Sequence, residues 1–180
     1  YDASIVSFDS VNVTVAANAH EIAMTKLTTE AVTVENGSAA GAADDDVADI
    51  NLALSDATGA ADSITLNLTN NDADNEMAIT TMDFGVANVE TVNLVFARSK
   101  DIADVSEFNI VDINSAHDTL NLSGTADVTI NAKDSATTIK STVVGDVALT
   151  VGAVDAVVTM GAGDDTVAFA GTLDSDDSVT

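Results

Sequence analysis

Apolar residues alternate with threonine, asparagine or serine in short segments along most of this chain. These segments are residues 11–15, 32–34, 50–54, 64–68, 92–94, 120–122, 128–130, 147–151, 158–160 and 167–169. A period of two places successive side chains on opposite faces of a β-strand, so each segment is predicted to be a half-buried strand. The pattern therefore predicts an all-β chain.

The spacing of these segments narrows the architecture. From Asn121 onward their centres lie near residues 121, 129, 139, 149, 158 and 168. Such even spacing is typical of a β-solenoid or a β-sandwich. The narrow apolar alphabet and the repeated outward Asn and Thr favour a right-handed parallel β-solenoid, a β-roll-like strand ladder. A β-sandwich is the alternative, but it usually needs larger aromatic core residues and hairpin turns, which only Asn36-Gly37 offers.

Three stretches depart from the alternation. Residues 37–49 and 70–76 are acidic and rich in small or polar residues, so we expect loops there. Residues 101–114 have apolar positions with partial helical spacing, which predicts a short helix or 3₁₀ turn. We divide the chain into an N-terminal β segment at 1–60, with its acidic loop at 37–49, and a solenoid-like segment at 61–180. One continuous domain is the alternative.

The charge balance excludes several partners. The chain carries 30 acidic and 5 basic residues, a net charge of −25, and its five Lys and Arg are spread along the sequence. Nucleic acids and anionic lipid surfaces attract clustered bases, so we expect no nucleic-acid partner. No apolar run approaches the roughly 20 residues of a membrane helix, so we expect no membrane insertion. With 46% hydrophobic residues the chain nevertheless has enough apolar surface to fold.

Composition also limits the core and the processing of the chain. Aromatic residues make up only 3% of it, which predicts a thin core of small aliphatic side chains. There is no cysteine, so disulfides cannot cross-link the chain, and any comparable cross-link must be a metal ion bound by oxygen ligands. The first residues are not a signal peptide. Because the sequence does not begin with Met, we expect a piece of a longer or processed protein.

A glycine-rich acidic turn at residues 160–169 carries the main functional signal. Gly161, Gly163, Asp165 and Val167 occupy four of the five defining positions of the calcium-binding repeat Gly-Gly-x-Gly-x-Asp-x-U-x, where U is a large apolar residue, and Met160 replaces the leading glycine. Asp165 is the first candidate ligand, together with the carbonyls of Gly161 and Gly163. Because Ca²⁺ takes 6–8 oxygens, one such loop supplies at best half a cage. The alternative is a plain Gly-Asp turn between strands.

Other acidic residues are weaker candidate ligands. Asp164, Asp174, Asp176 and Asp177 lie in or after the same turn. Two further concentrations of carboxylates consist of Asp44, Asp45, Asp46 and Asp49, and of Asp72, Asp74 and Glu76. Clustered carboxylates repel one another unless a cation lies among them. The alternative in both clusters is a solvated acidic loop.

Catalysis has little support in the sequence. The imidazoles are His20 and His117, and no Gly-x-Ser-x-Gly elbow, His-Glu-x-x-His helix or phosphate-binding loop is present. Ser and Asp are so common here that a Ser-His-Asp combination means little. We therefore expect no enzymatic activity, and we expect His117 at the surface or in a turn.

Three stretches resemble the calcium-dependent S-layer and RTX-type surface proteins of Gram-negative bacteria. Residues 88–94 (Asn-Val-Glu-Thr-Val-Asn-Leu) are similar to a recurrent phrase of these proteins, residues 62–70 to their Thr- and Asn-rich strands, and residues 161–167 with 173–180 to the entry of their repeat array. The chain departs from the family in having one well-formed repeat rather than several. The resemblance implies type I secretion, many bound calcium ions and a lattice at the bacterial cell surface. It also implies that an ion lies between consecutive turns.

These observations lead to one functional expectation and one alternative. The expected function is structural: an extracellular, calcium-stabilised segment that self-assembles into an S-layer, sheath or filament. Its expected partners are copies of itself, and a cell-surface polysaccharide is a further candidate. The alternative is an adhesin-like stalk or binding module of a large type I-secreted RTX protein.

Overall fold

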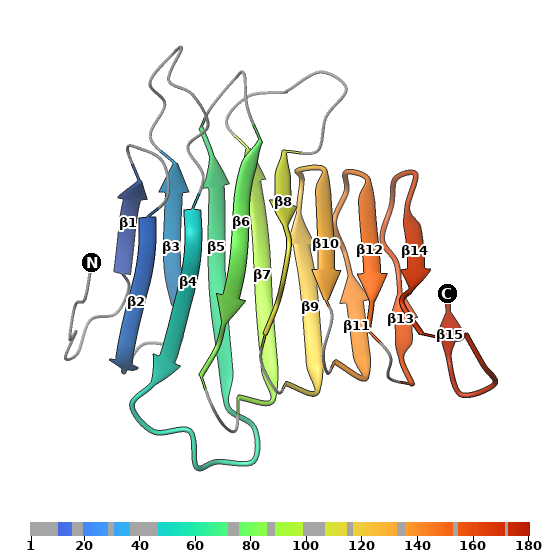
Figure 1. Ribbon diagram of the computed structural model, residues 1–180, viewed down its shortest axis with the longest axis horizontal. Helices are drawn as coiled ribbons and strands as arrows, with labels where there is room; N and C mark the ends of the chain where they lie inside the picture. Colours follow the sequence, from blue (N-terminus) through green and yellow to red (C-terminus); the bar gives the residue numbers. More distant parts are fainter. Residues whose placement is uncertain are drawn as a thin grey trace.

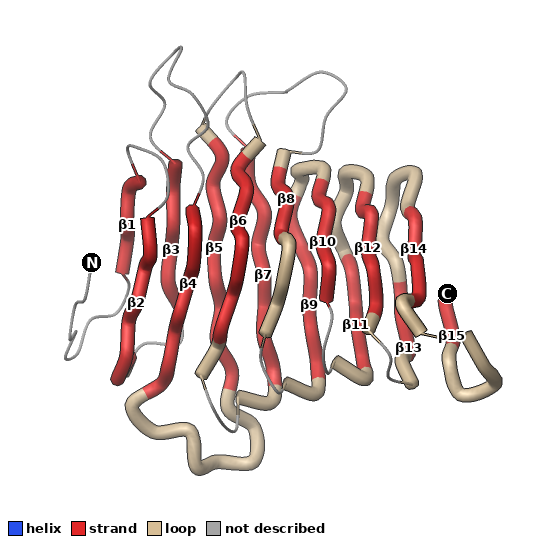
Figure 2. Tube along the Cα trace, viewed as in Figure 1, coloured by secondary structure: helices blue, strands red, loops and turns tan. Residues whose placement is uncertain are grey.

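A computed structural model describes most of the chain. The described residues are 11–15, 20–28, 31–36, 47–71, 76–85, 89–98, 107–114, 117–132, 136–152, 155–171 and 173–180. These residues form strands and their connections and contain no helix (Figure 2). The all-β prediction is therefore confirmed.

The strands wind into a flat coil with two parallel sheets (Figure 1). The eight-stranded sheet has the order β1-β3-β5-β7-β9-β11-β13-β15, and the seven-stranded sheet has the order β14-β12-β10-β8-β6-β4-β2. Odd-numbered strands thus build one sheet and even-numbered strands build the other, so each coil adds one strand to each sheet. All these strand pairs are parallel. This confirms the predicted parallel solenoid ladder.

The strand bounds follow the chain in order. The strands are β1 Val11–Val15, β2 His20–Leu27, β3 Ala31–Asn36, β4 Val47–Leu54, β5 Ser63–Asn70, β6 Met77–Asp83, β7 Thr91–Arg98, β8 Phe108–Ile110, β9 Thr119–Gly124, β10 Val128–Ala132, β11 Thr138–Ser141, β12 Val147–Val151, β13 Val157–Thr159, β14 Thr166–Phe169 and β15 Ser178–Val179.

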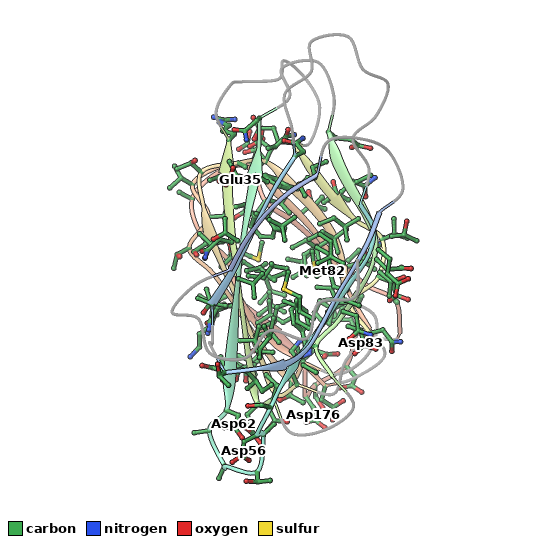
Figure 3. The ribbon with its side chains drawn as sticks, turned by 90° about the vertical axis from the view of Figure 1, so that its left-hand side faces the viewer. Glu35, Asp56, Asp62, Met82, Asp83 and Asp176 are labelled. Carbon is green, nitrogen blue, oxygen red and sulfur yellow. The ribbon has the colours of Figure 1, made fainter. Side chains whose placement is uncertain are left out.

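The core lies between the two sheets and follows from the alternation. In β5, Ile64, Leu66 and Leu68 are buried, whereas the Ser, Thr and Asn residues that precede each of them are only half-buried. Figure 3 looks along the coil axis and shows Met82 in the space between the sheets. The core is mostly aliphatic, as the composition predicts, but it also buries phenylalanines. Phe96 and Phe108 contact each other with ring centroids 5.2 Å apart.

Coil length rises and then falls along the chain. The paired residues Val11 and Val32 of β1 and β3 are 21 residues apart. Between β3 and β5, the hydrogen-bonded side chains of Thr33 and Asn67 are 34 residues apart in the sequence. Between β7 and β9, the corresponding asparagine pair is 28 residues apart. The acids that precede β10 and β12 are 19 residues apart, and those that precede β12 and β14 are 18 residues apart. The coil that pairs β12 with β14 therefore has the length of two nonapeptide repeats. The last pairing, between β13 and β15, is longer, with Val157 and Ser178 21 residues apart.

Most predicted strands are present, but several elements differ from the predictions. The loop predicted at 37–49 ends earlier, because residues 47–49 begin β4. The alternation does not identify β2, β6 or β15. In β6, two outward residues, Thr80 and Thr81, separate buried Ile79 from buried Met82, which breaks the period of two. The helical prediction for 101–114 is wrong for its described part, residues 107–114. There, Phe108 and Ile110 are inward residues of β8, and Ile113 forms a bridge with Met82.

Both sheets pass through the proposed boundary at residue 60. In the eight-stranded sheet β3 pairs with β5, and in the seven-stranded sheet β4 pairs with β6. The described residues on either side of residue 60 therefore share both sheets.

Candidate functional site

The predicted calcium turn lies at one edge of the coil, directly before β14. In Figure 1 this edge is at the top, and the turn connects β13 to β14. The turn stacks on the equivalent turn of the preceding coil, residues 142–147. The backbone N–H of Ala162 donates to the carbonyl of Val143 (3.3 Å), and the N–H of Val147 donates to Oδ1 of Asp165 (3.0 Å). Two turns that are 18 residues apart thus form one stacked unit.

Both glycines of this turn are needed for the stacking. A Cβ atom on Gly161 would lie 2.4 Å from the carbonyl oxygen of Val143. Gly163 has a φ of +116°, and a Cβ there would lie 2.6 Å from the carbonyl oxygen of Gly145 and 2.9 Å from Oδ1 of Asp146. A side chain at either position would push the turns apart. The glycine pattern is thus explained by the close approach of oxygen-bearing backbone, which is also the feature that a calcium site between turns requires.

A file of acidic residues runs along the same edge, and the sequence reasoning missed it. We name Glu107, Asp127, Asp146 and Asp164 the acidic file. The N–H of Asp127 donates to Oε2 of Glu107 (2.6 Å), that of Asp146 to Oδ1 of Asp127 (2.7 Å), and that of Asp164 to Oδ1 of Asp146 (2.7 Å). Each of the first three carboxylates therefore accepts a hydrogen bond from the backbone of the next acid.

The two ends of the acidic file differ in environment. Glu107 is fully buried, and its Oε1 forms an ion pair with the guanidinium of Arg98. Asp146 and Asp164 are exposed. Neighbouring strands are about 5 Å apart, and two unit charges at that distance repel by about 3 kcal/mol at an effective dielectric constant of about 20. Arg98 offsets this repulsion at one end, whereas the exposed acids depend on solvent and ions.

The second group of predicted ligands lies at the opposite edge. Asp174, Asp176 and Asp177 precede β15, and their turn is at the bottom in Figure 1. Oδ1 of Asp177 accepts the N–H of Ala156 (2.9 Å), and its Oδ2 accepts the N–H of Asp174 (3.0 Å). The N–H groups of Ala156 and then Asp174 hold the pKa of Asp177 below its usual 3.8. Asp177 therefore caps this turn, and the fold does not join the two groups into one site.

Acidic residues of the wider coils also gather at the lower edge. Asp56, Asp62 and Asp176 lie there in Figure 3. The carboxylate of Glu90 accepts the N–H of Asp62 at 2.7 Å, one coil away. The same interaction thus occurs at both edges: a carboxylate of one coil accepts a hydrogen bond from a backbone N–H of the neighbouring coil.

The weaker candidate ligands are only partly within the described residues. Asp44, Asp45, Asp46, Asp72 and Asp74 lie outside them. Asp49 is a half-buried residue of β4, and Glu76 precedes β6 and accepts a hydrogen bond from Asn109 (3.3 Å). Within the described ranges, His, Asp and Glu side chains form no group of three that could hold a metal ion. A calcium site would therefore need backbone carbonyls as ligands.

His117 differs from its expected placement. It lies in the connection before β9, but its side chain is 3% exposed, so the surface prediction is wrong. Burial of this kind is what a structural histidine shows, and it gives no support to catalysis.

The comparisons add no relative to this description. No family model, no curated protein and no solved structure matches the chain. In the part of the chain that the structure describes, no helix has the length and apolarity needed to cross a membrane. The function must therefore be argued from the coil and its edges.

Proposed function

We propose that this chain is a structural segment of an extracellular bacterial surface layer, sheath or filament, stabilised by calcium. The observation that carries the proposal is the stacking of the turn at 160–165 on the turn at 142–147. This contact brings carboxylates and backbone carbonyls of two coils to one edge. The parallel coil then extends by repetition, as expected of a building element rather than of a catalyst.

The proposed calcium ligands come from both stacked turns. Asp146 and Asp165 supply one carboxylate each, and the carbonyls of Val143 and Gly145 lie within the close contacts that the glycines of the turn permit. Carboxylate and carbonyl oxygens are the ligands that Ca²⁺ prefers. An ion bound there supplies positive charge between like-charged turns and links binding to folding. The sequence reasoning found Asp165 but not Asp146.

Calcium also explains how so acidic a chain assembles. At a net charge of −25, self-repulsion disfavours both the compact state and contact between copies. Ions at the acidic edges reduce that repulsion, and they can bridge the edges of neighbouring copies. An extracellular location suits this role because calcium is millimolar there.

Circular dichroism and light scattering in calcium, in magnesium and after chelation test the proposal. We expect calcium to raise the thermal midpoint and to increase the particle mass, and we expect chelation to reverse both effects. Magnesium is the matched control, since it demands tighter octahedral geometry and dehydrates reluctantly. Folding and mass that are unchanged by calcium contradict the proposal.

The coil geometry also favours a second candidate, a stalk of a larger secreted protein. Each coil adds one strand to each sheet, so length grows by about 4.8 Å per coil at nearly constant cross-section. A stalk and a layer differ in assembly. A calcium-bound chain that stays monomeric at high concentration favours the stalk, whereas ordered arrays in electron micrographs favour the layer.

A further inference from the structure

The outer face of the eight-stranded sheet is almost free of charge. Its outward residues, where the structure describes their side chains, are Ala31, Thr33, Glu35, Ser63, Thr65, Asn67, Thr69, Thr91, Asn93, Val95, Ala97, Thr119, Asn121, Ser123, Thr138, Lys140, Val157, Thr159 and Ser178. Among these described residues only Glu35 and Lys140 are charged, and their charges are opposite. Many of the acids that the structure describes lie instead in the turns at the two edges or on the outer face of the seven-stranded sheet. A surface without net charge is therefore built into a chain of net charge −25.

The upstream half of the opposite face lacks this property, whereas the described outward residues of β8, β10, β12 and β14 are uncharged. On the outer face of the seven-stranded sheet, Glu21, Asp49 and Asp83 flank buried residues of β2, β4 and β6. Two copies that approached through this face would bring like charges together, which costs several kcal/mol. The difference between the two faces identifies the eight-stranded sheet as the better contact surface.

We call the outer face of the eight-stranded sheet the uncharged face. Hydrogen bonds hold several of its side chains in place before any partner binds. Nδ2 of Asn121 donates to Oδ1 of Asn93 at 2.8 Å, and Nδ2 of Asn93 donates to the hydroxyl of Thr65 at 3.3 Å. Nδ2 of Asn67 donates to the hydroxyl of Thr33 at 3.4 Å. The threonines around them are β-branched and have few rotamers. Docking onto this face therefore costs little side-chain entropy.

The size of the face suits a protein partner. It presents about 20 side chains, close to the roughly 20–30 residues per side of a standard protein interface. The face also includes outward apolar residues, such as half-buried Val95 on β7 and Val157, which is 48% exposed. β7 is the fourth of the eight strands, so Val95 lies near the middle of the sheet.

We propose that this face binds the same face of a second copy of the chain. The inference rests on the proposed function and specifies one of its contacts. A face that pairs with itself is isologous and closes into a dimer, so growth of a layer requires a second contact. The acidic edges supply that contact through calcium, whereas the uncharged face needs no cation of its own. The dimer is thus the unit that calcium then links.

A charge at the centre of the face tests this arrangement. We compare Val95→Glu and Val95→Lys with the neutral variant Val95→Thr by light scattering coupled to size-exclusion chromatography, in chelator, where calcium cannot link the edges. In a symmetric contact each copy brings its own charge, so both charged variants should weaken dimerisation at least about 10-fold, whereas Val95→Thr should keep it. Ala148→Glu on β12, exposed on the seven-stranded sheet, is the matched control and should dimerise like the wild type. Circular dichroism verifies that each variant is folded.

The outcomes separate the inference from the proposed function. Assembly that is equally strong in Val95→Glu and Ala148→Glu overturns the face-to-face contact alone. A Val95→Lys variant that associates more strongly than the wild type also overturns it, because that result indicates an anionic partner. A wild-type chain that is monomeric both with and without calcium overturns the proposed assembly as well.

Discussion

The upstream coils, from β3 to β9, and the downstream coils, from β10 to β14, differ in the size of their cores and in the residues at their edges. Upstream, between β3 and β9, coils of 28–34 residues enclose a core with Phe96 and Phe108, and a buried ion pair lies at the edge at Glu107. Downstream, between β10 and β14, coils of 18–19 residues enclose mostly Val, Leu and Ala, and their edge consists of exposed acids and glycine turns. We therefore expect hydrophobic burial to stabilise the first region and solution ions to matter more for the stability of the second.

The largest expected effect comes from the upstream core. Phe96→Ala removes a fully buried ring and its contact with Phe108, so the free energy of unfolding should fall by about 4 kcal/mol. Urea denaturation measures the change. Phe169→Ala, at a partly buried position of β14, is the control and should lose roughly half as much. Equal losses would contradict a core concentrated upstream.

The buried end of the acidic file should respond next most strongly. Glu107→Gln removes the buried negative charge that pairs with the guanidinium of Arg98 and should reduce the free energy of unfolding by about 3 kcal/mol. The control Asp127→Asn keeps an oxygen that can accept the N–H of Asp146, so we expect a loss below about 1 kcal/mol. A loss for Asp127→Asn as large as that for Glu107→Gln is incompatible with a file that differs between its two ends.

In the downstream turns, the backbones of neighbouring coils lie so close together that there is no room for a side chain at the glycine positions. Gly163→Ala places a Cβ against the carbonyl of Gly145 and forces a positive φ on alanine, so stability should fall by about 2 kcal/mol and calcium affinity should fall with it. Calorimetry measures both quantities. Gly59→Ala meets only the end of the Asp62 side chain and is the control, with little change expected in either. Unchanged calcium affinity in Gly163→Ala would remove this turn from the proposed site.

The smallest effect concerns pH. Hydrogen bonds from Ala156 and Asp174 lower the pKa of Asp177 in the folded chain below the usual 3.8, so the folded state binds this proton less tightly than the unfolded state. The stabilisation is full above pH 3.8 and is lost as pH falls through the lower folded pKa. Hydrogen exchange at β15 should show this loss in the wild type but not in Asp177→Asn. The control Asp176→Asn should behave like the wild type, and a loss that persists in Asp177→Asn refutes the assignment.

Alternation in the sequence predicts where strands form. It does not predict which residues become neighbours when the chain winds into a coil. The alternating segment 147–151 has the bounds of β12, because Val147, Leu149 and Val151 alternate cleanly with outward residues. The pattern does not identify β8, because its alternating Phe-Asn-Ile lies in a stretch whose apolar positions also fit partial helical spacing. It also misses the acidic file, because Asp127 and Asp146 are neighbours only after one coil of 19 residues is closed. Coil length, read as a separation between acids, is the signal that would have found it.

Amide hydrogen exchange followed by mass spectrometry tests the central claim most directly, because it compares both regions in one molecule. We predict that calcium slows exchange most in residues 142–169, where the stacked turns present Asp146, Asp164 and Asp165, and much less in β5 and β7. Exchange in residues 142–169 that is the same in calcium and in chelator, or protection confined to the upstream coils, would contradict the account.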